Sequence, residues 1–442
     1  MLSHANIARE LLLVLLASYL FASVKAFRSA LNPLVVAIAP WLAILAAQEI
    51  IAPSMYFSWL AAAIIAGSLL CVGLGAIIVL VCMPNTPLRS ELTRLEPVRA
   101  RRWLRYSVFG AIIGGVSVHA GVTFYYGAIL GVGVSSTGSF SAYALFDEVM
   151  NSPVAWPYRI ATTMVQVGAV ICGLELRTKR PAYSVIIFFL AVVTSEGLFI
   201  ASRLGMFLAY SAVILGWLVF AGRRYRRMSP RLVLSGIVGL FVVAALYQYT
   251  SGRRVGTDDD AMNNRMVSGL ISSPSVLTGV MKDREGWIVG TLGGESFRGI
   301  MLFTTGQDWD SYAQEAYPIA PEMPETSNMV TGLWQILIDF GIAGSAILMT
   351  LMGALSTGLF MKFSAQPTAK RAGSLLCVYL LLCWLPIFVI THYMFFWCVM
   401  VVALKIDLLY CVAPDAGSDS PSVNRNISQS AESARPCLAH LE

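Results

Sequence analysis

An arginine and a glutamate within one apolar stretch are the residues whose types and spacing best suit chemistry. Arg203 interrupts a mainly apolar run, and Glu196 precedes it by seven positions. If one helix continued through both, this spacing would put them on the same face. Ionisable groups at membrane depth are costly and often functional, and the arginine fork suits a phosphate or pyrophosphate. The structural alternatives are a plain Arg203–Glu196 ion pair and an arginine whose charge reaches the interface at a helix end.

Two further side chains are candidates for proton transfer. Asp339 precedes Gly341-Ile342-Ala343-Gly344 at the start of an apolar span. It would activate an acceptor hydroxyl as a base or simply cap the helix. His392 lies at a junction between two apolar spans and is a candidate general base near neutral pH, although a lone histidine there is more often structural. His119, inside an earlier apolar span, is a weaker candidate.

A polar insert at 250–329 interrupts the apolar spans. With about 80 residues, it is too long to be a mere connector. Its aromatic side chains could stack on sugar rings or form a small core of the insert itself. They are Trp287, Phe297, Phe303, Trp309, Tyr312 and Tyr317. The insert holds neither histidine nor cysteine, so no metal-ligand spacing and no disulfide framework is expected in it.

Composition defines the elements that must position these residues. Hydrophobic residues make up 57% of the 442 residues and charged residues only 13%, whereas soluble domains carry about 25% charge. Runs of about 20 apolar residues recur, and continuous runs indicate helices rather than a barrel. The sequence therefore predicts an all-α, polytopic integral membrane protein with roughly eleven transmembrane helices. The spans are predicted at 9–25, 33–50, 57–82, 106–130, 158–175, 182–199, 204–220, 232–249, 342–360, 373–390 and 394–412.

Basic clusters predict the orientation of the spans. The clusters at 89–105, 177–180, 223–231 and 362–371 alternate with loops poor in basic residues, which places them in the cytoplasm. They explain the net charge of +6 without a nucleic-acid partner. Arg203, the insert, Asp339 and His392 then share the outer side. The expected regions are N-terminal transmembrane helices (1–249), the large outer loop (250–329), C-terminal transmembrane helices (330–412) and a disordered cytoplasmic tail (413–442).

Three stretches resemble the oligosaccharide repeat-unit polymerase family, the Wzy-type O-antigen polymerases of bacterial envelopes. They are 31–34 (LNPL) with 39–42 (APWL), 201–203 (ASR) ahead of the insert, and 326–332 (TSNMVTG) leading into 338–344 (IDFGIAG). The resemblance implies a GT-C-like, metal-independent and cofactor-free glycosyltransferase of the bacterial inner membrane. Its substrate would be an undecaprenyl-pyrophosphate-linked oligosaccharide, and its partners membrane lipids, a chain-length regulator and a flippase.

On this resemblance Arg203 would hold the pyrophosphate and polarise the leaving group. Asp339, which lies in a matching stretch, or His392 would activate or orient the attacking hydroxyl. Arg254, Arg265 and Arg298 of the insert could assist, but these arginines and His392 match no motif of the family and are selected from the residues themselves. An O-antigen ligase, with the same donor and a different acceptor, is the nearest alternative. A flippase or an export-complex scaffold is an alternative of a different class, although a transporter would more often show two related halves.

Overall fold

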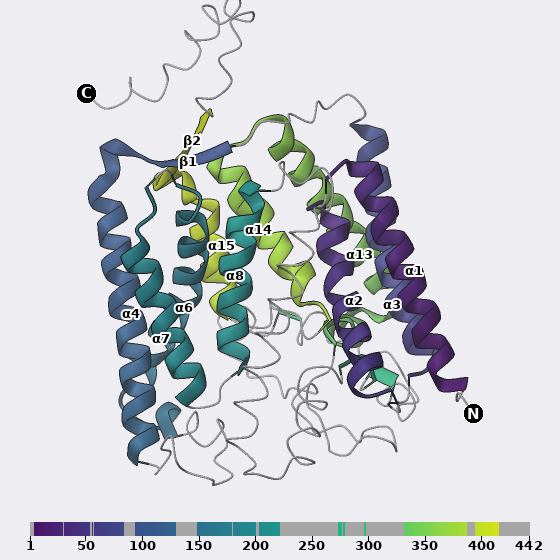
Figure 1. Cartoon of the computed structure of the whole chain (residues 1–442), viewed down its shortest axis with the longest axis horizontal. Helices are drawn as coiled ribbons and strands as arrows, with labels where there is room; N and C mark the ends of the chain where they lie inside the picture. The colour runs from purple at the N-terminus through teal and green to yellow at the C-terminus, as the bar shows by residue number, and fades with distance from the viewer. Residues whose placement is uncertain are drawn as a thin grey trace, which may run out of the picture.

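The chain folds mainly into helices. The computed structural model describes residues 4–29, 31–53, 55, 57–83, 93–129, 148–178, 180–199, 203–221, 273–275, 277–278, 296–297, 331–386 and 394–414. The helices run side by side in one bundle (Figure 1). Their bounds are α1 (His4–Phe27), α2 (Pro33–Ile51), α3 (Trp59–Cys82), α4 (Arg102–Ile129), α6 (Ala155–Glu175), α7 (Tyr183–Phe199), α8 (Arg203–Ala221), α13 (Gly332–Ala365), α14 (Ala369–Trp384) and α15 (Met394–Leu404).

Five of the described helical segments are long and apolar enough to cross a membrane. They are Ile7–Phe27, Pro33–Ile50, Trp59–Cys82, Arg99–Ile129 and Gly332–Ala365. Large apolar side chains such as Leu11, Val14 and Ile77 are exposed along them. Soluble proteins rarely expose contiguous apolar surface of this kind, so the bundle is compatible with a membrane protein. The span predicted at 232–249 lies outside the described residues.

The prediction of a purely α-helical chain needs a correction, because the described residues include a two-stranded antiparallel sheet. Strand β1 (Thr93–Pro97) pairs with β2 (Tyr410–Pro414), and Leu95 lies opposite Val412. The last predicted span, 394–412, was also too long, since α15 ends at Leu404. Lys405 and Asp407 interrupt the apolar run there, and the backbone groups that follow find their partners in β1.

The helices form two groups joined by a third. Helices α1, α2 and α3 pack together and α13 packs on α3 and α2, while α4, α6, α7 and α8 form the second group. Helix α14 contacts α2, α13 and α8 and so touches both groups, and α15 packs on α14 and α6. Figure 1 shows α4 and α7 on one flank and α13 towards the other. At the α3–α13 contact, a Cβ on Gly75 would lie 2.0 Å from the carbonyl oxygen of Thr350. Small residues thus allow these two backbones to approach closely.

The end of the bundle that carries β1 and β2, called the sheet end here, is held together by Glu175. This buried carboxylate accepts hydrogen bonds from the Tyr410 hydroxyl (2.7 Å) and the Ala182 backbone N–H (3.0 Å) and pairs with Arg105. Burial and the neighbouring carboxylate raise the pKa of Tyr410 well above its ordinary value, so this hydroxyl remains a donor. The contacts join α6, α4 and β2, segments far apart in the sequence.

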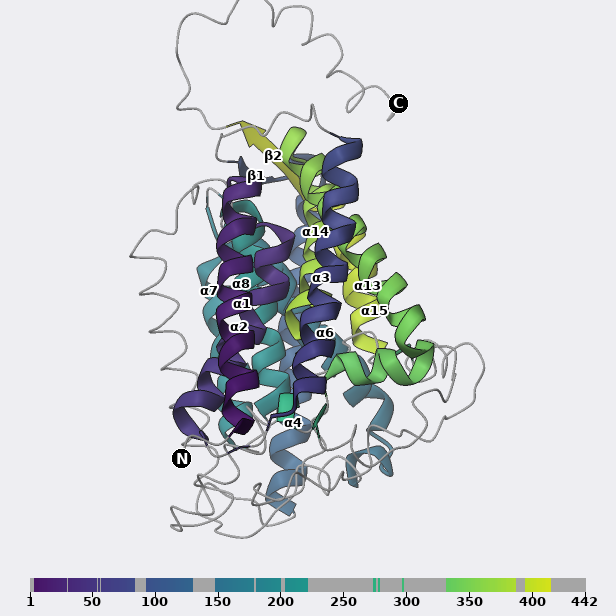
Figure 2. The same ribbon diagram turned by 90° about the vertical axis from the view of Figure 1, so that its right-hand side faces the viewer.

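The opposite end, called the insert end, contains a break in α13. Gly341 adopts φ 63° and ψ −176°, so the helix consists of two segments that meet at this residue. Side chains 331–339 are all buried. The Ser345 hydroxyl bridges the break by donating to the carbonyl oxygens of Ile336 (3.1 Å) and Gly341 (2.6 Å). The first segment lies across the bundle before the helix turns along it (Figure 2).

Candidate functional site

Arg203 begins α8, whereas Glu196 lies one turn before the end of α7. A continuous helix through both residues, which would have put them on one face, does not form. Thr194 and Tyr210, sixteen positions apart, share a hydrogen bond between their hydroxyls; on one straight helix they would be roughly 24 Å apart. The chain therefore reverses between α7 and α8. The backbones of Glu196 and Arg203 still lie close to this reversal, at the insert end.

Glu196 is buried in a polar cluster with side chains from α4 and α6. Its carboxylate lies 2.7 to 2.8 Å from the His119 Nδ1 and accepts a hydrogen bond from the Thr123 hydroxyl at 3.0 Å. The His119 ring stacks on Tyr158, with ring centroids 4.5 Å apart and planes 14° apart. A buried carboxylate is tolerated only when such partners surround it. We call these four residues the His119–Glu196 cluster.

The sequence ranked His119 below the other candidates, and its pairing with Glu196 was missed. His119 and Thr123 are four positions apart, so they lie on one face of α4 and approach the same carboxylate. Two polar groups at this spacing in an apolar span were the pattern from which a buried polar cluster could have been predicted. Nothing local to α4 could identify α7 as the helix that supplies the carboxylate.

Asp339 lies inside α13, immediately before the break, and is almost completely buried. Its Oδ2 accepts a hydrogen bond from the backbone N–H of Ser296 at 2.6 Å. The neighbouring Phe297 contacts Phe340 of α13 and Trp397 of α15, with centroid separations of 6.4 and 6.2 Å. Asp339 therefore connects the insert to α13, and Phe297 connects it to α13 and α15.

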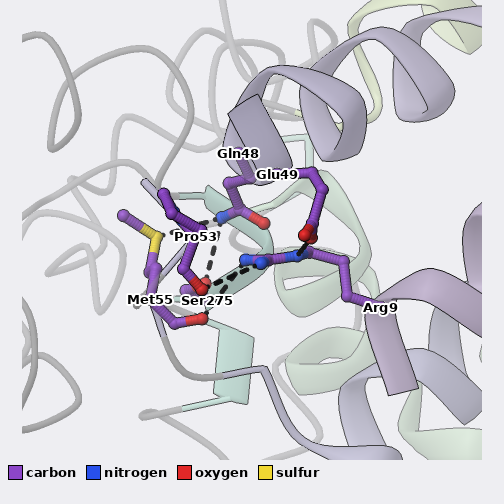
Figure 3. A network of polar contacts seen from close by, with 6 residues as sticks. All are labelled: Arg9, Gln48, Glu49, Pro53, Met55 and Ser275. Atoms are coloured by element: carbon purple, nitrogen blue, oxygen red, sulfur yellow. Dashed lines mark hydrogen bonds and ion pairs between the residues drawn. The ribbon is translucent and has the colours of Figure 1, made fainter. Parts of the chain in front are cut away.

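A second contact between the insert and the bundle is built on the α2–α3 connection (Figure 3). Arg9 of α1 is fully buried and pairs with Glu49 at 2.6 Å. Its two terminal nitrogens donate to the carbonyl oxygens of Met55 (3.2 Å) and Pro53 (3.1 Å). The guanidinium thus fixes the turn that follows α2, as its rigid set of donors allows.

The fixed turn holds part of the insert. The Gln48 amide donates to the Ser275 hydroxyl at 3.0 Å. The Thr278 hydroxyl oxygen accepts from the Ser58 backbone N–H at 3.1 Å. Neither Arg9 nor Glu49 was predicted as a site residue, although one charge on each of two neighbouring apolar segments is the pattern of an ion pair between helices.

The structure separates the two acidic candidates. Glu196 belongs to the α4–α7 flank and Asp339 to the α13 flank (Figure 1). Four other predicted site residues, Arg254, Arg265, Arg298 and His392, lie outside the described residues, as does the side chain of Arg203. In the described part of the chain no group of three or more His, Cys, Asp or Glu side chains is arranged to hold a metal ion.

The described geometry thus provides an imidazole–carboxylate pair beside the α7–α8 reversal, a carboxylate (Asp339) that attaches the insert to the bundle, and an arginine (Arg9) that fixes the turn to which another part of the insert is bound. The first arrangement can exchange a proton, and the other two hold backbone in place. Comparison of the chain with models of known protein families, with curated proteins and with solved structures finds no match.

Proposed function

We propose that this protein is a membrane glycosyltransferase that polymerises oligosaccharide repeat units linked to undecaprenyl pyrophosphate. The product would be an O-antigen or exopolysaccharide, made at the outer face of the bacterial inner membrane. The observation that supports this proposal is the attachment of the insert to the end of the bundle at which α7 and α8 meet. The described insert residues Ser275, Thr278 and Ser296 contact α2, the α2–α3 connection and α13 at this end, and polar groups there would lie next to a lipid-linked substrate.

The proposed roles follow from the positions of the residues. Arg203, the first residue of α8, would bind the pyrophosphate at the membrane surface and stabilise its charge as it leaves. Arg254, Arg265 and Arg298 of the insert would add positive charge around the same group. Asp339 would hold the insert through Ser296, so we give it a positioning role, while His392 stays a candidate for orienting the acceptor. The reaction would use no metal and no cofactor.

The test is the length distribution of surface glycan, separated on a gel, from cells with and without this protein. A polymerase predicts that the ladder collapses to a single repeat unit when the protein is absent. Loss of decoration with polymer still accumulating on the lipid carrier would instead identify a ligase. An unchanged ladder would contradict the enzyme proposal and favour a transporter or an export-complex scaffold.

Replacing Arg203 tests the proposed site within the same assay. Arg203→Ala should abolish the ladder at normal protein level, because the donor pyrophosphate loses its charged partner. Arg203→Lys keeps the charge but not the bidentate fork, so it should restore only part of the polymer. Arg159→Ala is the matched control, because Arg159 is exposed on α6 near the same end of the bundle. Full activity of Arg203→Ala would contradict the pyrophosphate role.

A further inference from the structure

The His119–Glu196 cluster has the geometry of an oriented acid–base pair. The carboxylate of Glu196 contacts only one of the two imidazole nitrogens, Nδ1, at 2.7 to 2.8 Å. A carboxylate at this nitrogen favours the tautomer in which Nδ1 carries the proton. The lone pair of the neutral ring is then on Nε2, which is the nitrogen able to accept a proton.

Neighbouring side chains fix both groups in place. The Thr123 hydroxyl donates to the Glu196 carboxylate, so one carboxylate bridges two residues of α4. Tyr158 of α6 covers one face of the His119 ring by stacking. In the described part of the chain, Nε2 has no hydrogen-bond partner, and the side chain of His119 remains 12% exposed. A histidine held only for structure would more often use both nitrogens.

Few other ionisable groups face this pair among the described residues. Glu196 comes from α7 and Tyr158 from α6. Arg159, beside Tyr158, is exposed and lies over the Trp156 ring instead, with its guanidinium carbon 5.7 Å from the ring centroid. Among the described residues, Glu196 is therefore the carboxylate that contacts the His119 ring.

The pair lies close to the predicted donor site. Glu196 is three residues before the end of α7, and Arg203 begins α8 directly after the reversal. Asp339 lies on the opposite flank of the bundle, and its Oδ2 already accepts the Ser296 N–H. A general base must come within hydrogen-bond reach of the attacking hydroxyl. That hydroxyl attacks the carbon bonded to the pyrophosphate, so we expect the base on the α4–α7 flank, beside Arg203, rather than on the α13 flank.

We infer that His119, oriented by Glu196, is the general base of the glycosyl transfer. This inference rests on the proposed polymerase function. The acceptor hydroxyl of the incoming repeat unit gives its proton to His119 Nε2 as its oxygen forms a bond to the anomeric carbon of the donor sugar. The bond between that carbon and the pyrophosphate oxygen breaks, and its electron pair leaves with undecaprenyl pyrophosphate. The proton is afterwards released from His119 to solvent.

The experiment measures the pH dependence of polymer formation in membrane vesicles that contain the full chain and purified lipid-linked repeat units. With the wild-type protein, the rate should rise with pH, which we call the rising limb of the pH–rate profile, and then reach a plateau. The reason is that only the neutral imidazole accepts a proton. His119→Gln should lower the plateau by about 100-fold or more, in the range of general-base catalysis, and should remove the rising limb. A smaller loss is expected for Glu196→Gln, with the limb shifted to lower pH because the amide no longer stabilises the imidazolium.

Matched variants separate this role from a structural one. Thr123→Val removes a hydrogen bond to the same carboxylate but leaves the imidazole, so it should keep the rising limb. Thermal unfolding in detergent should show that His119→Gln remains folded. If this variant does not fold, the pH at which the rate rises in Glu196→Gln tests the inference by itself. A wild-type limb and rate in both His119→Gln and Glu196→Gln would overturn the inference while the polymerase stands. Failure of the wild-type protein to elongate the repeat unit would instead contradict the polymerase proposal.

Discussion

At the scale of single residues, Arg9 and His119 differ in how many of their side-chain nitrogens have partners in the part of the chain that the structure describes. Arg9 donates to Glu49 and to two backbone carbonyls, so each of its nitrogens has a partner. His119 uses only Nδ1 among the described residues. A buried guanidinium whose nitrogens all have partners stabilises a turn, whereas a neutral imidazole nitrogen that has a lone pair and no partner can accept a proton. This difference leads us to assign structure to Arg9 and proton transfer to His119.

Removal of the Arg9 side chain tests the structural assignment. Arg9→Ala leaves Glu49 and the carbonyls of Pro53 and Met55 without their donor. We expect a loss of about 2 to 3 kcal/mol in stability, less than for a wholly buried pair because Glu49 is 32% exposed. Thermal unfolding in detergent measures it. Glu10→Ala, on an exposed neighbour in α1, is the control and should leave the unfolding temperature unchanged. Equal unfolding temperatures of Arg9→Ala and wild type would contradict the role.

At the scale of elements, the break in α13 determines where the insert is attached. Asp339 is the second residue before Gly341 and lies in the short first segment, which is buried. The torsion angles at Gly341, φ 63° and ψ −176°, belong to a region that residues with a Cβ avoid. The direction of the first segment, and with it the position of Asp339 against Ser296, therefore depends on a single glycine.

Replacing this glycine should disturb the attachment of the insert. Gly341→Ala should cost about 1 to 3 kcal/mol through backbone strain, and limited proteolysis should cut the insert faster as Asp339 moves away from Ser296. Gly358→Ala is a matched control in the same helix, because nothing lies within 4 Å of an added Cβ there. It should be neutral or slightly stabilising. Equal proteolysis rates of the two variants would show that the break does not position the insert.

At the scale of the whole molecule, exposed aromatic residues mark both ends of the bundle. Trp103 and Tyr106 are exposed at the start of α4, at the sheet end. Tyr125 and Trp156 are exposed towards the other end. Tyr106 and Tyr125 are nineteen residues apart on one helix, which corresponds to roughly 28 Å and matches a hydrocarbon core of about 30 Å. Aromatic belts at this separation favour a bundle that crosses the bilayer.

The orientation in the membrane can be tested with thiol labelling. Cys82 ends α3 and Cys411 lies in β2, both exposed and at the sheet end. With Cys437 replaced by serine, a membrane-impermeant maleimide should label the protein only after the cells are permeabilised, because we expect the sheet end in the cytoplasm. The variant Asn151→Cys places an exposed thiol just before α6 and should react in intact spheroplasts. The reverse pattern would invert the predicted topology and place the insert inside.

The sequence by itself determined the helical character of the chain and where most of its described helices lie. Each span of about 20 apolar residues satisfies its own backbone hydrogen bonds, so its position can be found without knowledge of its neighbours. The start of α2 is similarly local, since Asn32 caps it through the Val35 N–H and Pro33 occupies its first turn.

The tertiary structure alone decided which polar groups meet. The Glu196 carboxylate contacts His119 from 77 positions away, Arg9 contacts Glu49 from 40 positions away, and β1 pairs with a strand more than 300 positions further along the chain. Such pairings depend on which helices pack together and how each is rotated, and an apolar span carries little information on either. The shared face of Glu196 and Arg203 required one continuous helix, and this condition is not met, because the residues belong to α7 and α8, which pack side by side.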